Sequence, residues 1–162
     1  MYIYITTGTY EFLRIIKEKH PNDSFLLMEN MEHALLLHET NGVTVFKTSR
    51  NYEVFESNGP IPEKGFVALN HVPITEEGKP LFEHHIKKLL GLGMNSIRML
   101  RPLKSNVYII LTIWENELAF KTWQMTKTYN EAFSMDKSNL GVTTTANLFS
   151  SNPYISTYFI KE

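Results

Sequence analysis

The chain has 162 residues, a length that suits one compact domain or two small, intimately packed halves. A formal net charge of -1 argues against a general nucleic-acid binder, and the absence of cysteine excludes disulfides, zinc–thiolate sites and thiol nucleophiles. The first residues lack a signal-peptide pattern, and the longest apolar run, 107–114, is too short to cross a bilayer. We therefore expect a cytoplasmic protein with no membrane or nucleic-acid partner.

The first third of the chain predicts short strands and helices that end at a proline-rich segment. The expected ranges are a strand at 2–6, a helix at 9–19, strands at 25–29, 34–39 and 43–46, and a short helix at 51–56. The apolar stripe of the first helix consists of Phe12, Leu13, Ile15 and Ile16. Segment 58–62, with two prolines after an Asn-Gly pair, is the best domain boundary.

The rest of the chain predicts a β-α-β-β-α-β order, which defines a ferredoxin-like unit. The expected ranges are a strand at 66–75, a helix at 76–90, a hairpin of strands 97–101 and 107–114, a helix from the cap Asn116 to about Phe133, and a strand at 155–160. The inward residues of helix 76–90 are Leu81, Phe82, Ile86, Leu89 and Leu90, and Gly91 and Gly93 follow it as a tight connection. Residues 1–62 repeat this order in a truncated form. We therefore predict an α+β fold with a degenerate half at 1–62 and a complete unit at 63–162.

Three segments of the second unit resemble a known family. IRMLRP (97–102), LTIWE (111–115) and AFKTWQ (119–124) are similar to the antibiotic-biosynthesis-monooxygenase (ABM) superfamily, in particular to its IsdG-type haem-degrading monooxygenases. From YITTGTYEFL (4–13) to TYFIKE (157–162), the chain resembles the longer, fused branch, which includes HmoB-type proteins and the target of RNAIII-activating protein. Ordinary members pair as dimers whose sheets form a barrel-like body. The resemblance thus implies that this chain builds that body alone and stays monomeric.

The same resemblance implies a haem site at Asn70 and Trp123. Strand alternation places Asn70 on one face with Ala68 and Val72, and His71 on the other. By resemblance, the neutral amide of Asn70 donates to a ligand on the haem iron, and the broad indole of Trp123 presses on the porphyrin and distorts it. Judged from the residues alone, Asn70 is a strand-end asparagine that satisfies nearby backbone, and Trp123 is a core tryptophan.

The tenth residue after the tryptophan departs from the family pattern. Members carry a histidine iron ligand there, whereas this chain has Phe133, whose phenyl ring has no lone pair. Tyr129, one turn earlier on the same face, is a possible phenolate ligand. His84 and His85 belong to the other helix and diverge by about 100°, so they cannot readily share one ion. We assign no metal ligand.

The leading hypothesis is a haem-degrading monooxygenase, in which haem is both cofactor and substrate and dioxygen and an external electron donor are consumed. The expected catalytic residues are Asn70 and Trp123, and the expected haem-binding residues are Asn70, Trp123, Tyr129 and Phe133. One alternative is a non-catalytic ABM scaffold that binds a small apolar ligand or a protein partner in stress signalling. Another is a cofactor-free ABM oxygenase acting on an aromatic substrate. Phe133 favours both alternatives, while Asn70 together with Trp123 favours the monooxygenase.

Overall fold

The computed structural model describes residues 1–90, 96–133 and 148–161. Within these ranges the strands are β1 Tyr2–Gly8, β2 Ser24–Glu29, β3 Ala34–Thr40, β4 Arg50–Asn58, β5 Phe66–Pro73, β6 Ile97–Pro102, β7 Val107–Trp114 and β8 Tyr154–Ile160. The helices are α1 Tyr10–Lys19, α2 Lys79–Leu90, α3 Glu117–Gln124 and α4 Lys127–Phe133. No helix of the described ranges is long and apolar enough to span a membrane.

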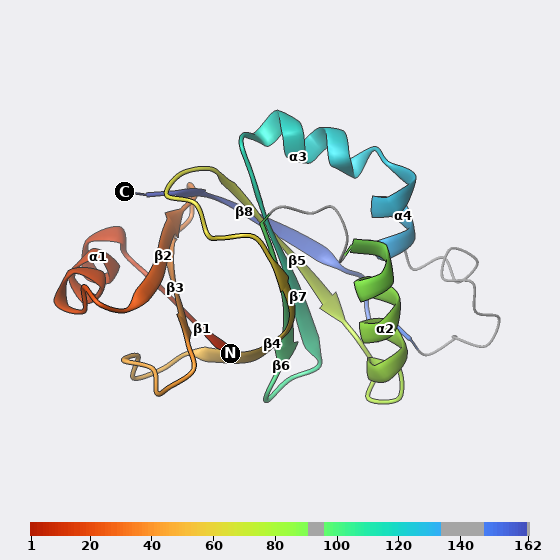
Figure 1. Ribbon diagram of the computed structural model, residues 1–162, viewed down its shortest axis with the longest axis horizontal. Helices are drawn as coiled ribbons and strands as arrows, with labels where there is room; N and C mark the ends of the chain where they lie inside the picture. Colours follow the sequence, from red (N-terminus) through yellow and green to blue (C-terminus); the bar gives the residue numbers. More distant parts are fainter. Residues whose placement is uncertain (91–95, 134–147, 162) are drawn as a thin grey trace.

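The strands close into one antiparallel barrel in the order β1-β3-β2-β8-β5-β7-β6-β4, and β4 returns to pair with β1. Figure 1 shows β1–β3 on one side of the barrel and β5–β8 on the other. Two seams join the halves, because β2 pairs with β8 and β4 pairs with β6. Inward residues of both halves, among them Ile5, Leu37, Leu69 and Leu111, form one buried cluster. Closing the sheet in this way removes most exposed strand edges.

The helices cover the outside of this barrel. Helix α1 lies on the side of β1–β3, whereas α2, α3 and α4 lie on the side of β5–β7 (Figure 1). Under α1, Leu13 packs with Leu27 and Leu36, and under α2 and α4 a second cluster includes Phe82 and Ile86. The α+β class and the ferredoxin-like order of the second unit are thereby confirmed.

The structure corrects two predicted elements of the first half. Segment 51–56 is not a helix but the middle of β4, which pairs with β1 on one side and with β6 on the other. Tyr52 points into the barrel core and Val54 packs against it, the alternation of a strand. Segment 43–46 is not a strand; Phe46 is instead buried beside the rings of Phe25 and His38.

The predicted helices differ in their ends and in their exposed residues. In α1 the Thr9 cap is present, but Phe12 and Ile15 are 61% and 44% exposed, so Leu13 is the residue that anchors this helix. Helix α2 starts at Lys79, not at residue 76.

Within α2, Phe82, Ile86 and Leu90 are buried as expected, whereas Leu81 is exposed. The side chain of Leu89 and the Gly91–Gly93 connection lie outside the described residues.

The helix expected from Asn116 to Phe133 is interrupted. The Asn116 side chain accepts from the Ala119 amide at 2.9 Å, which confirms the cap. The helix then stops at Gln124, and the Thr126 hydroxyl accepts from the Tyr129 amide at 3.2 Å at the start of α4. This break re-aims the second segment, so that α4 packs beside α2 as well as α3.

Candidate functional site

Strand β5 sets the position of Asn70 on the outer face of the barrel. Val67 and Leu69 belong to the inner core, while Ala68 packs with Phe120 of α3 and Val72 packs in the cluster under α2 and α4. The predicted alternation around Asn70 is therefore correct. The Asn70 side chain is only 1% exposed, although it is an amide.

Asn70 is held by Tyr129 of α4. The Tyr129 hydroxyl donates to Asn70 Oδ1 at 3.0 Å, and Gln124 Nε2 donates to the same hydroxyl at 3.4 Å. Asn70 Nδ2 is buried and has no hydrogen-bond partner among the described residues. An unpaired buried amide donor costs about 1–3 kcal/mol. Within the described residues, this buried donor is therefore unused.

Three aromatic side chains next to Asn70 form a packed group, here called the aromatic cluster: Trp123, Tyr129 and Phe133. The Trp123 ring meets Tyr129 at 4.9 Å and Phe133 at 6.1 Å, in both cases edge to face. Tyr129 and Phe133 lie 4.9 Å apart. Such edge-to-face pairs are favourable beyond the area that they bury. The structure therefore brings together all four residues that the sequence singled out.

Trp114 lies on the other side of Trp123. Their ring centroids are 5.0 Å apart, and Trp114 Nε1 donates to Thr112 Oγ1 at 2.9 Å. Trp114 also packs with Phe120 in the cluster between α3 and the sheet. These contacts agree with a packing role for Trp114.

The aromatic cluster does not fit an iron-ligated haem. Phe133 is 8% exposed and packs, with Ala132, in the apolar cluster that includes Phe82 and Ile86. Tyr129 is not a ready phenolate ligand, because burial raises the pKa of its hydroxyl and keeps it protonated. A flat macrocycle would also have to separate rings that now pack on one another.

His85 is a polar residue near this cluster that sequence reasoning set aside. A hydrogen bond links it to the backbone of Glu131 in α4, while its Nε2 is buried without a partner among the described residues. Burial lowers the pKa of His85, which favours the neutral imidazole. His85 lies near the cluster because α2 packs against α4, and no local sequence pattern predicts such a tertiary contact.

His71 belongs to a different environment, inside the barrel. Its Nε2 lies 2.8 Å from Ser156 Oγ, and its ring stacks on Tyr154 with centroids 4.4 Å apart. Burial and the neighbouring Arg50 charge lower the pKa of His71 to about 4. It therefore faces away from Asn70, as the alternation predicts, and does not contribute to the aromatic cluster.

Comparison with known proteins places this geometry in a family. The chain is 31% identical over 144 residues to the signal transduction protein TRAP of Staphylococcus epidermidis, covering 84% of each chain. It is 25% identical over 142 residues to a haem-degrading monooxygenase of Listeria monocytogenes, covering 85% of each. No protein-family model matches the chain.

Solved structures agree with these relatives. A major regulator of staphylococcal pathogenesis superimposes with a TM-score of 0.81 at 26% identity, over 97% of both chains. A ferredoxin-fold protein from Listeria monocytogenes, related to antibiotic-biosynthesis monooxygenases, superimposes with a TM-score of 0.75 at 23% identity, over 99% of this chain and 94% of that one. The chain belongs to the family of the staphylococcal signal transduction protein TRAP. Its fold is the ferredoxin-like fold of these solved structures.

Proposed function

We propose that this chain is a non-catalytic binding protein of the ABM fold, which acts by contact with a partner and not by degrading haem. The observation that carries the proposal is Phe133. Its ring is buried against Tyr129 and Trp123 at the position where the family pattern has an iron ligand. A protonated Tyr129 offers no replacement. The signal transduction name of the relative from Staphylococcus epidermidis supports this reading.

A second candidate function is haem degradation with dioxygen and an external electron donor, and one observation favours it. Asn70 Nδ2 is a buried donor without a partner among the described residues, beside the indole of Trp123 and linked to it through Tyr129. A buried donor without a protein partner is uncommon in native structures, and an acceptor on a bound ligand is one way to satisfy it. In this reading Asn70 and Trp123 are the catalytic residues, and Tyr129 and Phe133 line the haem. The Listeria relative that is named a haem-degrading monooxygenase supports it.

A hemin titration separates the two candidates. The purified protein, Phe133→His and Phe133→Leu are each titrated with hemin while the Soret band is followed, and ascorbate is then added in air. We expect no saturable Soret shift for the native chain or for Phe133→Leu. We expect a saturable shift for Phe133→His, because the imidazole supplies the missing iron ligand.

Other outcomes would change the assignment. A saturable shift of the native protein at equimolar hemin, followed by bleaching of the Soret band with ascorbate, would establish the second candidate and remove the first. Oxidation of an aromatic substrate by the metal-free protein would instead indicate a cofactor-free ABM oxygenase.

A further inference from the structure

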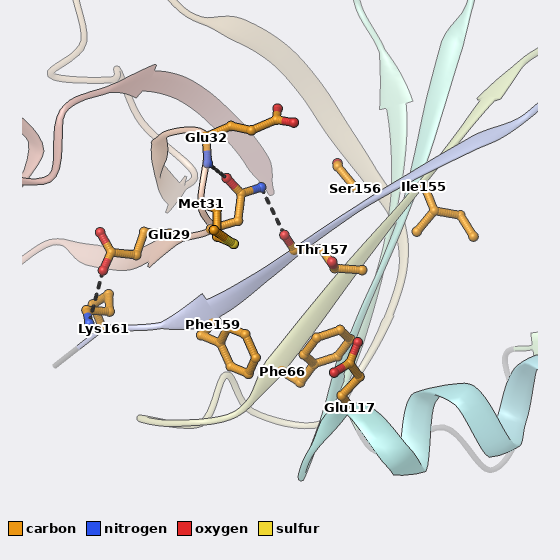
Figure 2. Close-up of a pocket in the computed structure, with 11 residues that line it drawn as sticks. Glu29, Met31, Glu32, Phe66, Glu117, Ile155, Ser156, Thr157, Phe159 and Lys161 are labelled. Carbon is orange, nitrogen blue, oxygen red and sulfur yellow. Dashed lines mark hydrogen bonds and ion pairs between the residues drawn. The ribbon is translucent and has the colours of Figure 1, made fainter.

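A cavity of about 700 Å³ opens outside the barrel, where strand β8 meets the turn between β2 and β3. Ile155, Thr157 and Phe159 line one wall, and Met31 and Glu32 line the opposite one. Figure 2 shows the rings of Phe159 and Phe66 side by side below β8, with the Glu117 carboxylate next to Phe66. We call this cavity the β8 cleft. It is distinct from the aromatic cluster, none of whose residues line it.

The β8 cleft exposes backbone along one edge of β8. This strand pairs with β5 at every position from Tyr154 to Phe159, but with β2 only at Phe159 and Ile160. No strand of the described ranges pairs with 155–157 on the β2 side. The Thr157 carbonyl turns toward this side, since it accepts from Asn30 Nδ2 at 3.0 Å.

In an antiparallel strand the N–H and C=O groups of one residue point to the same side, and this side alternates along the chain. The backbone groups of Ile155 and the Thr157 amide therefore also face the cleft. Together they form a short template for an added strand.

The side chains of the cleft have a defined chemistry. Ile155 and Phe159 are 41% and 55% exposed, and Phe159 rests edge to face on the buried Phe66 ring at 5.3 Å. The charged groups that line the cleft are three carboxylates, Glu29, Glu32 and Glu117, and one ammonium group, Lys161. Lys161 is already paired with Glu29 at 3.1 Å, and Glu117 lies 3.7 Å from the exposed Lys121 of the same helix. The cleft thus has an apolar floor, formed by Ile155 and Phe159, and an acidic rim, formed by Glu32 and Glu117.

We propose that the β8 cleft binds an extended peptide segment of a protein partner, which adds to the edge of β8 as a strand and carries alternating apolar and basic residues. The backbone of the segment pairs with the N–H and C=O of Ile155 and with the N–H of Thr157, whose carbonyl is already bonded to Asn30, as in β-strand addition. Its apolar side chains lie against Ile155 and Phe159, and its lysine or arginine side chains meet Glu32 and Glu117. Phosphorylated or acidic segments are disfavoured by the same carboxylates.

A defined peptide tests this proposal on the intact protein. The probe is a fluorescently labelled hexapeptide of alternating valine and lysine, with blocked ends, followed by anisotropy at low salt. Two matched peptides accompany it: one with glutamate for lysine, and one with N-methylated valines, which cannot complete the strand hydrogen bonds. We expect saturable binding of the lysine peptide only, together with slower hydrogen exchange at the amides of Ile155 and Thr157.

Charge-reversal variants test the rim. The double variant Glu32→Lys/Glu117→Lys is expected to weaken binding by about fivefold or more, as two exposed ion pairs allow. Glu77→Lys makes the same kind of charge change at an exposed residue just before α2, and is expected to leave the affinity unchanged. Because all these carboxylates lie at the surface, the variants are expected to fold.

Three results would overturn the proposal. The first is an absence of saturable binding, the second is equal binding of the lysine and glutamate peptides, and the third is exchange protection away from β8. Slow exchange of Ile155 and Thr157 without peptide, in a particle of twice the chain mass, would assign the cleft to a second copy and would also overturn it. The hemin titration reports on a separate site, so either experiment can fail without the other.

Discussion

At the scale of single residues, the distinctive feature is the pairing of Asn70 with Tyr129. An amide has a donor and an acceptor end, and the single phenol hydroxyl satisfies only one of them. If the amide were turned round, the hydroxyl would accept from Nδ2 and the oxygen would be left unpaired. In either orientation one polar atom of Asn70 stays buried without a partner among the described residues.

Removing the Tyr129 hydroxyl measures how much its hydrogen bond to Asn70 contributes to the stability of the fold. We predict that Tyr129→Phe lowers the free energy of unfolding by about 1–3 kcal/mol, because the buried Asn70 amide then loses its described partner altogether. Urea denaturation followed by tryptophan fluorescence measures the change. Tyr154→Phe is the matched control, since that ring is half exposed, and it should cost much less. Equal losses for both variants would contradict a specific role for the hydroxyl.

His71 makes stability depend on pH. Its folded-state pKa of about 4 lies below the ordinary value of 6.5, so the unfolded chain takes up the proton first as the pH falls. Its contribution is complete above pH 6.5 and is lost between 6.5 and 4, by roughly 3 kcal/mol in total. We predict that His71→Gln flattens this part of the stability profile in urea titrations from pH 7 to pH 4. His84→Gln, at an exposed residue of α2, is the control for loss of an imidazole, and a profile for His71→Gln that parallels the native one would refute the assignment.

At the scale of residues, the sequence predicted the site residues that belong to a family motif. The resemblance to a family pattern drew attention to Asn70, Trp123 and Phe133, and Tyr129 was added because it lies one turn before Phe133. The structure brings these four residues together. The bond between Tyr129 and Asn70 was not predictable, because it depends on the break between α3 and α4, which aims Tyr129 at the sheet. The bond between His85 and the backbone of Glu131 likewise depends on helix packing.

At the scale of elements, alternation and turn residues were reliable guides where a strand pairs with its neighbour in sequence. Both strands of the β6–β7 hairpin appeared in the predicted places. The helix prediction at 51–56 was wrong because the strands that pair with this segment are distant in sequence. This short segment becomes a strand because β1 and β6, both distant in sequence, pair with its two edges, and such long-range pairing overrides local preference.

The connection into β5 contains a glycine that the fold requires. Gly65 has φ of +147°, and a Cβ atom there would lie 2.7 Å from the Trp114 carbonyl oxygen. We predict that Gly65→Ala lowers the free energy of unfolding by roughly 1–3 kcal/mol, through backbone strain and this collision. Gly42→Ala is the matched control, because its nearest neighbour would be 3.7 Å away. Urea denaturation of both variants measures the difference, and a neutral Gly65→Ala would show that the β5 entry relaxes freely.

At the scale of the whole molecule, the two halves of the chain share one barrel and one inner core. We propose that residues 1–62 and 63–162 correspond to the degenerate and the complete ferredoxin-like unit. Strand β4 of the first unit fills the place beside β6, and β2 fills the place beside β8. Without these two pairings, the edges of β6 and β8 would be unpaired.

This closure leads to a prediction about assembly. Strands in a closed barrel offer few free edges. In the part of the chain that the structure describes, β8 has a short unpaired edge at the β8 cleft, which is lined by carboxylates. We therefore predict that the chain is a monomer in dilute solution, with a mass by light scattering near 18.8 kDa. Raising the protein concentration tenfold should leave that mass unchanged. Glu32→Gln/Glu117→Gln, which removes two rim carboxylates without introducing a new charge, should also stay monomeric if closure of the barrel, and not charge repulsion, keeps the copies apart. A native particle of twice the mass would mean that the fused barrel still pairs, so that the first unit does not replace the partner of an ordinary ABM dimer.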